Sequence, residues 1–138
     1  MRTVSEPRTV GELMTGDPVV VSVDMPLADA AAMMDFYRVS GLPVVDSNGC
    51  LVGVLSQTDL LHARATEPLW SAWPSLTVRH LMTRPAVTVE SDVSIQAAAQ
   101  LMDDRRIHRL VVTAADGETP IGVLSVSDLV RSMGEGCE

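Results

Sequence analysis

The chain contains no lysine and few aromatic side chains, and both shortages limit what it can do. Its 10 basic residues are all arginine, against 18 acidic residues, and the formal net charge at pH 7 is −8. This balance argues against the broad positive surface that nucleic acid requires. An aromatic content of 3% disfavours a platform on which bases stack. We therefore expect no nucleic-acid partner, although a local pocket of arginine and histidine could still hold a phosphate.

Cysteines and long hydrophobic runs are also scarce. Two cysteines, Cys50 and Cys137, are too few for a disulfide framework or a cysteine metal site. No apolar run approaches the ~20 residues that span a bilayer, and residues 1–10 are too polar for a secretion signal. The three histidines have no metal-ligand spacing. The expectation is a cytoplasmic protein with no membrane partner and no metal.

The chain of 138 residues contains one sequence pattern twice, as an internal repeat. The segment Leu13-Met14-Thr15 recurs as Leu81-Met82-Thr83, and Gly53-Val54-Leu55-Ser56 recurs as Gly122-Val123-Leu124-Ser125. The order of matches is kept across both halves, which indicates duplication. We predict a first repeat over 8–63, a linker over 64–76 and a second repeat over 77–133. Repeats of this size are marginal alone, so the two should pack about a pseudo-two-fold axis.

Each repeat predicts a short helical turn followed by a β-α-β-β-α unit, and the fold class is α+β. Asn48-Gly49 and Asp116-Gly117 predict hairpin turns, since Asn and Gly accept positive φ. Asp24 and Asp92 are expected to cap the helices that follow them. The predicted strands are 19–23, 42–45 and 51–55, then 86–90, 110–113 and 121–124; the predicted main helices are 27–37, 57–63, 95–105 and 126–133.

A polar motif stands where the last strand of each repeat meets its last helix. It contains Ser56, Thr58 and Asp59 in the first repeat, and Ser125, Ser127 and Asp128 in the second. Helix N-termini favour anions such as phosphate, and a carboxylate can accept hydrogen bonds from two ribose hydroxyls. The alternative is that the serines are only N-caps and the aspartates only favour the helix dipole. Duplication of the whole pattern favours a binding site.

A basic run, Arg105-Arg106-Ile107-His108-Arg109, lies at a helix-to-strand junction of the second repeat. For Arg105 and Arg106 we favour a solvated helix end, where cations suit the dipole. His108 and Arg109 are candidates for contact with phosphate. The first repeat has the uncharged pair Ser40 and Gly41 there. The two sites should therefore differ.

The double unit resembles a pair of cystathionine-β-synthase-type (CBS) domains. The resemblance covers residues 8–133 and rests on Leu-Met-Thr followed by Pro, on Leu-Pro-Val-Val-Asp at 42–46, on Ile-His-Arg-Leu-Val-Val at 107–112 and on two Gly-x-x-Ser-x-x-Asp runs. It implies a regulatory module, not an enzyme, that binds an adenosine compound in one or both of two crevices. The ligands implied are AMP, ADP or ATP, with S-adenosylmethionine as a further candidate.

The resemblance also assigns roles to residues. Asp59 and Asp128 would bind ribose hydroxyls, and His108 and Arg109 would contact phosphate. The motif hydroxyls of Ser56, Thr58, Ser125 and Ser127 would line the phosphate or ribose, while strand backbone near Val21 and Val89, with Pro43 and Val112, would flank adenine. The second repeat departs from the first at two positions, with Val111 in place of Pro43 and Ala114 in place of Asp46. Equal occupancy of both crevices is therefore not expected.

The resemblance further implies a homodimer that passes its signal to a separate output protein. One alternative is a protein-protein interaction module with degenerate or empty crevices. Another is an enzyme acting through Asp59 or Asp128, which the lack of any visible base–nucleophile pair disfavours. The linker tryptophans, Trp70 and Trp73, are expected to pack the linker down.

Overall fold

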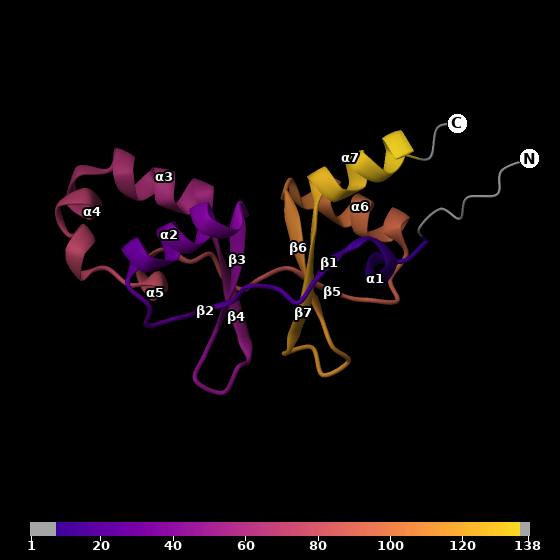
Figure 1. Cartoon of the computed structure of the whole chain (residues 1–138), viewed down its shortest axis with the longest axis horizontal. Helices are drawn as coiled ribbons and strands as arrows, with labels where there is room; N and C mark the ends of the chain where they lie inside the picture. The colour runs from indigo at the N-terminus through magenta and orange to yellow at the C-terminus, as the bar shows by residue number, and fades with distance from the viewer. Residues whose placement is uncertain (1–7, 136–138) are drawn as a thin grey trace, which may run out of the picture. The chain divides into compact units, whose positions relative to one another are not determined.

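The computed structural model describes residues 8–135, and the chain divides into two compact units (Figure 1). The central unit is one continuous stretch, Val19–Ala86. The split unit joins the segment up to Pro18 to the segment that begins at Val87. The model contains both helices and sheets, as the α+β prediction requires.

The central unit contains a three-stranded sheet in the order β2-β3-β4. β2 runs parallel to β3, and β3 runs antiparallel to β4. The hairpin between β3 and β4 turns at Gly49, whose φ of 81° suits glycine, as predicted. The strands are β2 (Val21–Ser22), β3 (Gly41–Val45) and β4 (Leu51–Ser56); the helices are α2 (Leu27–Tyr37), α3 (Gln57–Ala65), α4 (Glu67–Ser71), the 3-10 helix η1 (Trp73–Ser75) and α5 (Val78–Leu81).

The split unit has a four-stranded sheet in the order β1-β7-β6-β5. Its additional strand, β1, is two residues long and places Thr15 opposite Val123. The central unit has a single bridge at the matching position, between Val54 and Thr83. The strands are β1 (Thr15–Gly16), β5 (Thr88–Glu90), β6 (Arg109–Thr113) and β7 (Pro120–Ser125); the helices are α1 (Val10–Leu13), α6 (Ile95–Arg105) and α7 (Val126–Glu135).

Each unit has its own aliphatic core. Leu42 and Leu55 are paired across β3 and β4 in the central unit and are fully buried. Leu110 and Leu124 occupy the same places on β6 and β7 in the split unit. Burial of one such side chain contributes about 1.5 to 3 kcal/mol. Aliphatic side chains from strands and helices therefore build both cores, as the low aromatic content requires.

The short helices α1 and α5 pack in the unit formed mainly by the other sequence repeat. Val10 of α1 is fully buried in the core of the split unit, and Val78 of α5 is fully buried in the core of the central unit. Backbone hydrogen bonds fix both helices, from Val10 N–H to Val93 O (2.9 Å) and from Val78 N–H to Met25 O (2.9 Å). The compact units and the sequence repeats therefore have different bounds.

The linker is folded and belongs to the central unit. It contains the end of α3, then α4 and η1. Trp73 packs against the central core, as expected, whereas Trp70 stays 38% exposed. The Trp70 ring lies 5.4 Å from the Trp73 ring and stacks under the Arg64 guanidinium at 4.4 Å. The cation–π contact keeps Trp70 against the α3 surface.

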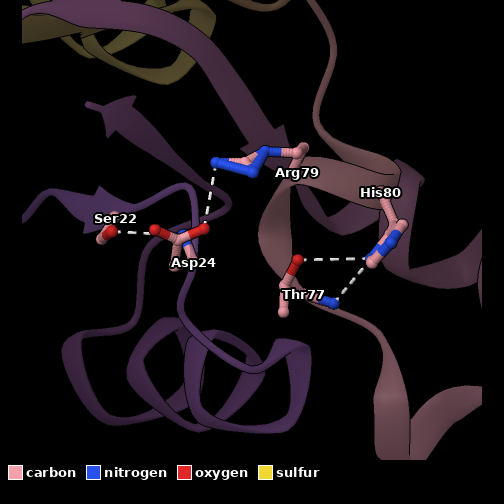
Figure 2. A network of polar contacts seen from close by, with 5 residues as sticks. All are labelled: Ser22, Asp24, Thr77, Arg79 and His80. Atoms are coloured by element: carbon pink, nitrogen blue, oxygen red, sulfur yellow. Dashed lines mark hydrogen bonds and ion pairs between the residues drawn. The ribbon is translucent and has the colours of Figure 1, made fainter. Parts of the chain in front are cut away.

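The predicted caps at Asp24 and Asp92 are wrong. α2 has Pro26 at its N-cap with no side-chain hydrogen bond, and α6 is capped by Ser94, whose hydroxyl accepts from Ala97 N–H at 3.0 Å. Each aspartate lies two residues before its N-cap position, too early in the chain to cap the helix. Asp24 instead forms an ion pair with Arg79 at 3.0 Å (Figure 2). Both side chains are more than half exposed, so the pair contributes little to stability.

The second hairpin is fixed by a carboxylate. Gly117 turns the chain with φ 72°, as predicted. Asp116 accepts hydrogen bonds from the Thr119 hydroxyl (2.7 Å) and from the backbone N–H groups of Glu118 (2.8 Å) and Thr119 (2.9 Å). These hydrogen bonds, the Thr119 hydroxyl first, lower the pKa of Asp116 below its ordinary value of 3.8. The ionised carboxylate therefore favours the folded hairpin.

This hairpin should lose stability in acid. Because the pKa of Asp116 is lower in the folded than in the unfolded chain, its contribution is complete above the unfolded pKa and is lost as pH falls through the folded pKa. Urea unfolding midpoints measured between about pH 5 and pH 3 should therefore fall less steeply for Asp116→Asn than for the parent chain. Asp103→Asn, which changes an exposed carboxylate on α6, is the control. Equal slopes for the parent and Asp116→Asn would contradict the prediction.

The short helices α1 and α5 both begin with a capping box, in which the side chain three residues after the N-cap accepts a hydrogen bond from the N-cap backbone N–H. The accepting side chain differs between the two helices. In α1, Thr9 donates to the Glu12 carboxylate through its N–H (3.1 Å) and its hydroxyl (3.0 Å). Hydrogen bonds from the backbone N–H of Arg8, then from Thr9, lower the pKa of Glu12. In α5, Thr77 N–H donates to Nδ1 of His80 at 2.9 Å (Figure 2). An imidazole ring thus replaces a carboxylate at the positive end of a helix.

Replacing His80 with glutamate should therefore stabilise the central unit. The carboxylate would accept the same Thr77 N–H with a charge-assisted bond and would favour the helix dipole, which together contribute about 0.5 to 1 kcal/mol. Chemical denaturation at neutral pH is the measurement. His80→Gln, which can accept the same hydrogen bond without a charge, is the matched control. If the His80→Glu chain is no more stable than the control, a charged acceptor in the capping box of α5 does not stabilise the central unit.

Candidate functional site

Two strand-to-helix corners carry the Ser-x-x-Asp motifs, and both are built in the same way. At the β4–α3 corner, Ser56 is the N-cap, and its hydroxyl accepts from Asp59 N–H at 3.2 Å. Oδ2 of Asp59 accepts in return from the Ser56 backbone N–H at 2.9 Å. At the β7–α7 corner the corresponding distances between Ser125 and Asp128 are 3.1 Å and 2.9 Å. Both motifs therefore form a reciprocal cap.

The outer oxygen of each aspartate faces a residue that the sequence analysis missed. Oδ1 of Asp59 accepts from the Thr83 hydroxyl at 3.1 Å. Oδ1 of Asp128 accepts from Arg131 Nη2 at 2.6 Å. Arg131 could have been found from its i, i+3 spacing. Thr83 lies 24 residues from Asp59 along the chain, and only the repeated Leu-Met-Thr pattern pointed to it.

The remaining motif hydroxyls lie on the first helical turns. Thr58 in α3 and Ser127 in α7 are both exposed. Ser56 and Ser125 are half-buried, and Asp128 is 6% exposed. Each corner thus combines an open first turn with a carboxylate held in place by its own N-cap.

The predicted adenine-flanking residues belong to the strands beside these corners. Val21 pairs with Val44 in the central sheet, and Val89 pairs with Val112 in the split sheet. The side chains of Val21 and Val112 are buried in the two cores, and Pro43 is also buried. A ligand could therefore meet these strands chiefly through their backbone groups.

His108 and Arg109 lie next to the corner of the split unit. Arg109 is paired with Ser125 across β6 and β7, and the His108 carbonyl accepts from Val126 N–H at 2.9 Å. His108 is exposed, and Arg109 is half-buried. In the central unit, Gly41 is paired with Ser56, so that corner has no cation on this strand. The split unit alone therefore brings a basic strand end to its motif.

A groove of about 800 Å³ opens between α6 and α7 in the split unit. His108 and Arg106 line it together with aliphatic side chains of both helices. Arg106 ends α6 in the left-handed conformation with φ 54°, and Arg105 and Arg106 are exposed, in keeping with a solvated helix end. Asp103 and Asp104 also line it, so the aliphatic surface of the groove is bordered by charges of both signs.

Residues 8–135 contain no group of three or more His, Cys, Asp and Glu residues that could hold a metal ion. None of the helices that the structure describes has the length and hydrophobicity of a membrane span.

Comparison with known proteins identifies the family. The sequence model of the CBS domain matches twice, at residues 10–66 and 78–135, and the chain therefore belongs to the CBS domain family. The match confirms the resemblance drawn from the repeated motifs. The protein is thus a tandem CBS domain pair.

Solved structures of CBS domain pairs share the fold. CBSX2 in complex with AMP is 33% identical, with a TM-score of 0.79 and coverage of 94% of this chain and 98% of that one. CBSX2 from Arabidopsis thaliana is also known from a second structure, 34% identical, with a TM-score of 0.78 and coverage of 92% and 94%. The CBS domain pair of protein MJ0100 has a TM-score of 0.85 at 22% identity, covers 96% of this chain and all of that one, and supports the fold alone.

The curated relatives are larger proteins. Inosine-5'-monophosphate dehydrogenase of Mycobacterium tuberculosis is 33% identical over 120 residues, which is 86% of this chain and 21% of the dehydrogenase. The enzyme of Methanocaldococcus jannaschii is 31% identical over 87% of this chain and 22% of its own length. The chain thus spans about a fifth of these relatives, and the matches show no dehydrogenase activity here.

Proposed function

We propose that the chain is a regulatory module that binds an adenine nucleotide, of the AMP, ADP or ATP type, at its Ser-x-x-Asp corners. The observation that carries the proposal is the likeness to CBSX2, which was solved with AMP and is 33% identical over 94% of this chain. The duplicated corners support it, since each holds a carboxylate and hydroxyls at a helix N-terminus. S-adenosylmethionine remains the further candidate ligand.

Each residue has a proposed role. Asp59 and Asp128 accept hydrogen bonds from ribose hydroxyls, and the hydroxyls of Thr58 and Ser127 meet the ribose or phosphate, as do those of Ser56 and Ser125. His108 and Arg109 contact phosphate in the split unit. The backbone of the strands that contain Val21, Pro43, Val89 and Val112 flanks adenine.

The ligand acts by its different affinity for two states of the module, because binding can shift an equilibrium only by that difference. A cytoplasmic homodimer that passes this change to a separate output protein is the assembly we propose. No step of this scheme breaks or forms a covalent bond, so the module is not proposed to be an enzyme.

One observation favours a second function, that of an interaction module with empty crevices. The outer oxygens of both aspartates already accept hydrogen bonds from the chain itself, Asp59 from Thr83 and Asp128 from Arg131. In this reading the motif only caps α3 and α7. Binding measurements separate the two functions.

Calorimetric titration of ligand-free protein with AMP, ADP, ATP and S-adenosylmethionine tests the proposal. At least one ligand should bind, and Asp128→Asn should weaken it by about tenfold or more, because a carboxylate acceptor is lost. Arg105→Ala, at an exposed helix end, should bind as the parent does. Thermal unfolding of each variant checks that it is folded. No binding of any ligand would support the interaction module instead.

A further inference from the structure

The two corners differ most at the outer oxygen of the aspartate. In both, Oδ2 is held by the N-cap serine at 2.9 Å. Oδ1 of Asp59 accepts from a neutral hydroxyl, Thr83, at 3.1 Å, whereas Oδ1 of Asp128 is paired with the Arg131 guanidinium at 2.6 Å. A ligand that donates hydrogen bonds to Oδ1 meets a hydroxyl in one unit and a cation in the other.

The difference comes from one position of the repeat. A threonine stands beside both corners, since Thr83 bridges to Val54 and Thr15 pairs with the equivalent Val123. One turn into the helix, however, the central unit has the exposed His62 and the split unit has Arg131. The split unit therefore has an arginine within reach of Asp128, whereas the central unit has a histidine at the equivalent position.

Arg131 is poorly placed to serve stability alone. Its side chain is 59% exposed while that of Asp128 is 8% exposed. Because the guanidinium stays largely in water, it can leave Asp128 without itself being buried unpaired. It does occupy an acceptor position on the one carboxylate oxygen that the reciprocal cap leaves available, and a ribose diol would compete with it there.

We propose that Arg131 is a specificity-determining residue that makes the split unit select phosphorylated nucleotides over nucleosides. This inference rests on the proposed function. A neutral nucleoside that takes Oδ1 of Asp128 leaves the guanidinium without an anion. A nucleotide supplies a phosphate with which the displaced guanidinium pairs through its planar fork. The Thr83 hydroxyl of the central unit imposes no such charge requirement.

The proposal predicts opposite effects on two ligands. In an Asp59→Asn background, which weakens the central site, Arg131→Gln should bind adenosine more tightly, because a competitor for Asp128 is gone. The same change should bind AMP less tightly, because a phosphate partner is lost. The ratio of AMP to adenosine affinity should fall by about tenfold. His108 and Arg109 are unchanged, so their contribution cancels from the comparison.

Calorimetric titration with adenosine and with AMP measures both affinities. Arg131→Lys, which keeps the charge but loses the planar fork, should restore part of the ratio, and Arg105→Gln, at the exposed end of α6, should leave it unchanged. Equal losses for both ligands in Arg131→Gln, an unchanged ratio, or no gain for adenosine would overturn the inference while the proposed function stands. Failure of AMP and adenosine to bind the parent chain and every variant would overturn this inference; the proposed function would fall with it only if ADP, ATP and S-adenosylmethionine also failed to bind.

Discussion

Replacing Leu55 with alanine should lower the free energy of unfolding by about 2 to 5 kcal/mol. Leu55 is fully buried in β4, opposite Leu42 of β3, and both belong to the core of the central unit. The change removes the transfer free energy of the lost atoms and leaves a cavity between the sheet and its helices. Few small domains have stability to spare on this scale.

Urea unfolding followed by circular dichroism measures this loss. Leu61→Ala is the matched control, because Leu61 of α3 is 67% exposed and should cost less than about 0.5 kcal/mol. A loss of similar size in both variants would mean that the β3–β4 face is not the core of this unit.

The second large effect is expected at Gly53. A Cβ built there would lie 2.6 Å from the Thr83 carbonyl oxygen. That oxygen is fixed, since Thr83 and Val54 exchange backbone hydrogen bonds of 2.9 Å in both directions. The chain cannot accept the methyl group without separating the bridge from β4. Gly53→Ala should therefore destabilise the protein by about 1 to 3 kcal/mol.

Chemical denaturation of Gly53→Ala and of two other glycine variants tests this argument. Gly16→Ala is the control, because a Cβ at that position meets nothing within 4 Å. Gly122→Ala should also destabilise, since its Cβ would contact Met14 Sδ and the Thr15 carbonyl oxygen. A Gly53→Ala chain as stable as Gly16→Ala would show that the bridge can move.

The Gly53 result would also bear on the candidate site, because the same bridge brings Thr83 to Asp59. Loosening it should disturb the central corner without touching Asp128. In ligand titrations, Gly53→Ala should therefore change the affinity of the proposed site in the central unit more than that of the proposed site in the split unit.

Local sequence signals predicted the helices well. α2 and α6 have the predicted bounds, 27–37 and 95–105, because apolar spacing marks their length and the chain leaves both through a left-handed residue, Arg38 and Arg106. The hairpins were equally accessible, since Gly49 and Gly117 encode their own turns. The predicted first strand, 19–23, is shorter in the structure: only Val21–Ser22 pairs with β3.

Long-range contacts were beyond the reach of sequence patterns. β1 was not predicted, because it is two residues long and forms only by pairing with β7, more than 100 residues later. The partner of Asp24 is Arg79, 55 residues away, which no local capping rule could indicate. The placement of α1 and α5 in the two cores is also a matter of tertiary contacts.

In the candidate site, too, the sequence indicated some of the local contacts but not those that depend on tertiary structure. From the sequence, N-cap roles for Ser56 and Ser125 were the alternative to a binding site, and the structure shows both caps. The return hydrogen bonds to the aspartate side chains were not predicted. The occupants of the outer oxygens, Thr83 and Arg131, did not follow from the motif. The first depends on a backbone bridge from a distant segment, and the second on a rotamer of an exposed side chain.

The exchange of short helices has a consequence for any truncated form of the chain. A fragment of residues 87–135 lacks Val10, which fills the split core, and lacks the strand that borders β7. Residues 19–86, in contrast, contain every segment of the central unit. A fragment of residues 19–86 should therefore fold more readily by itself than a fragment of residues 87–135.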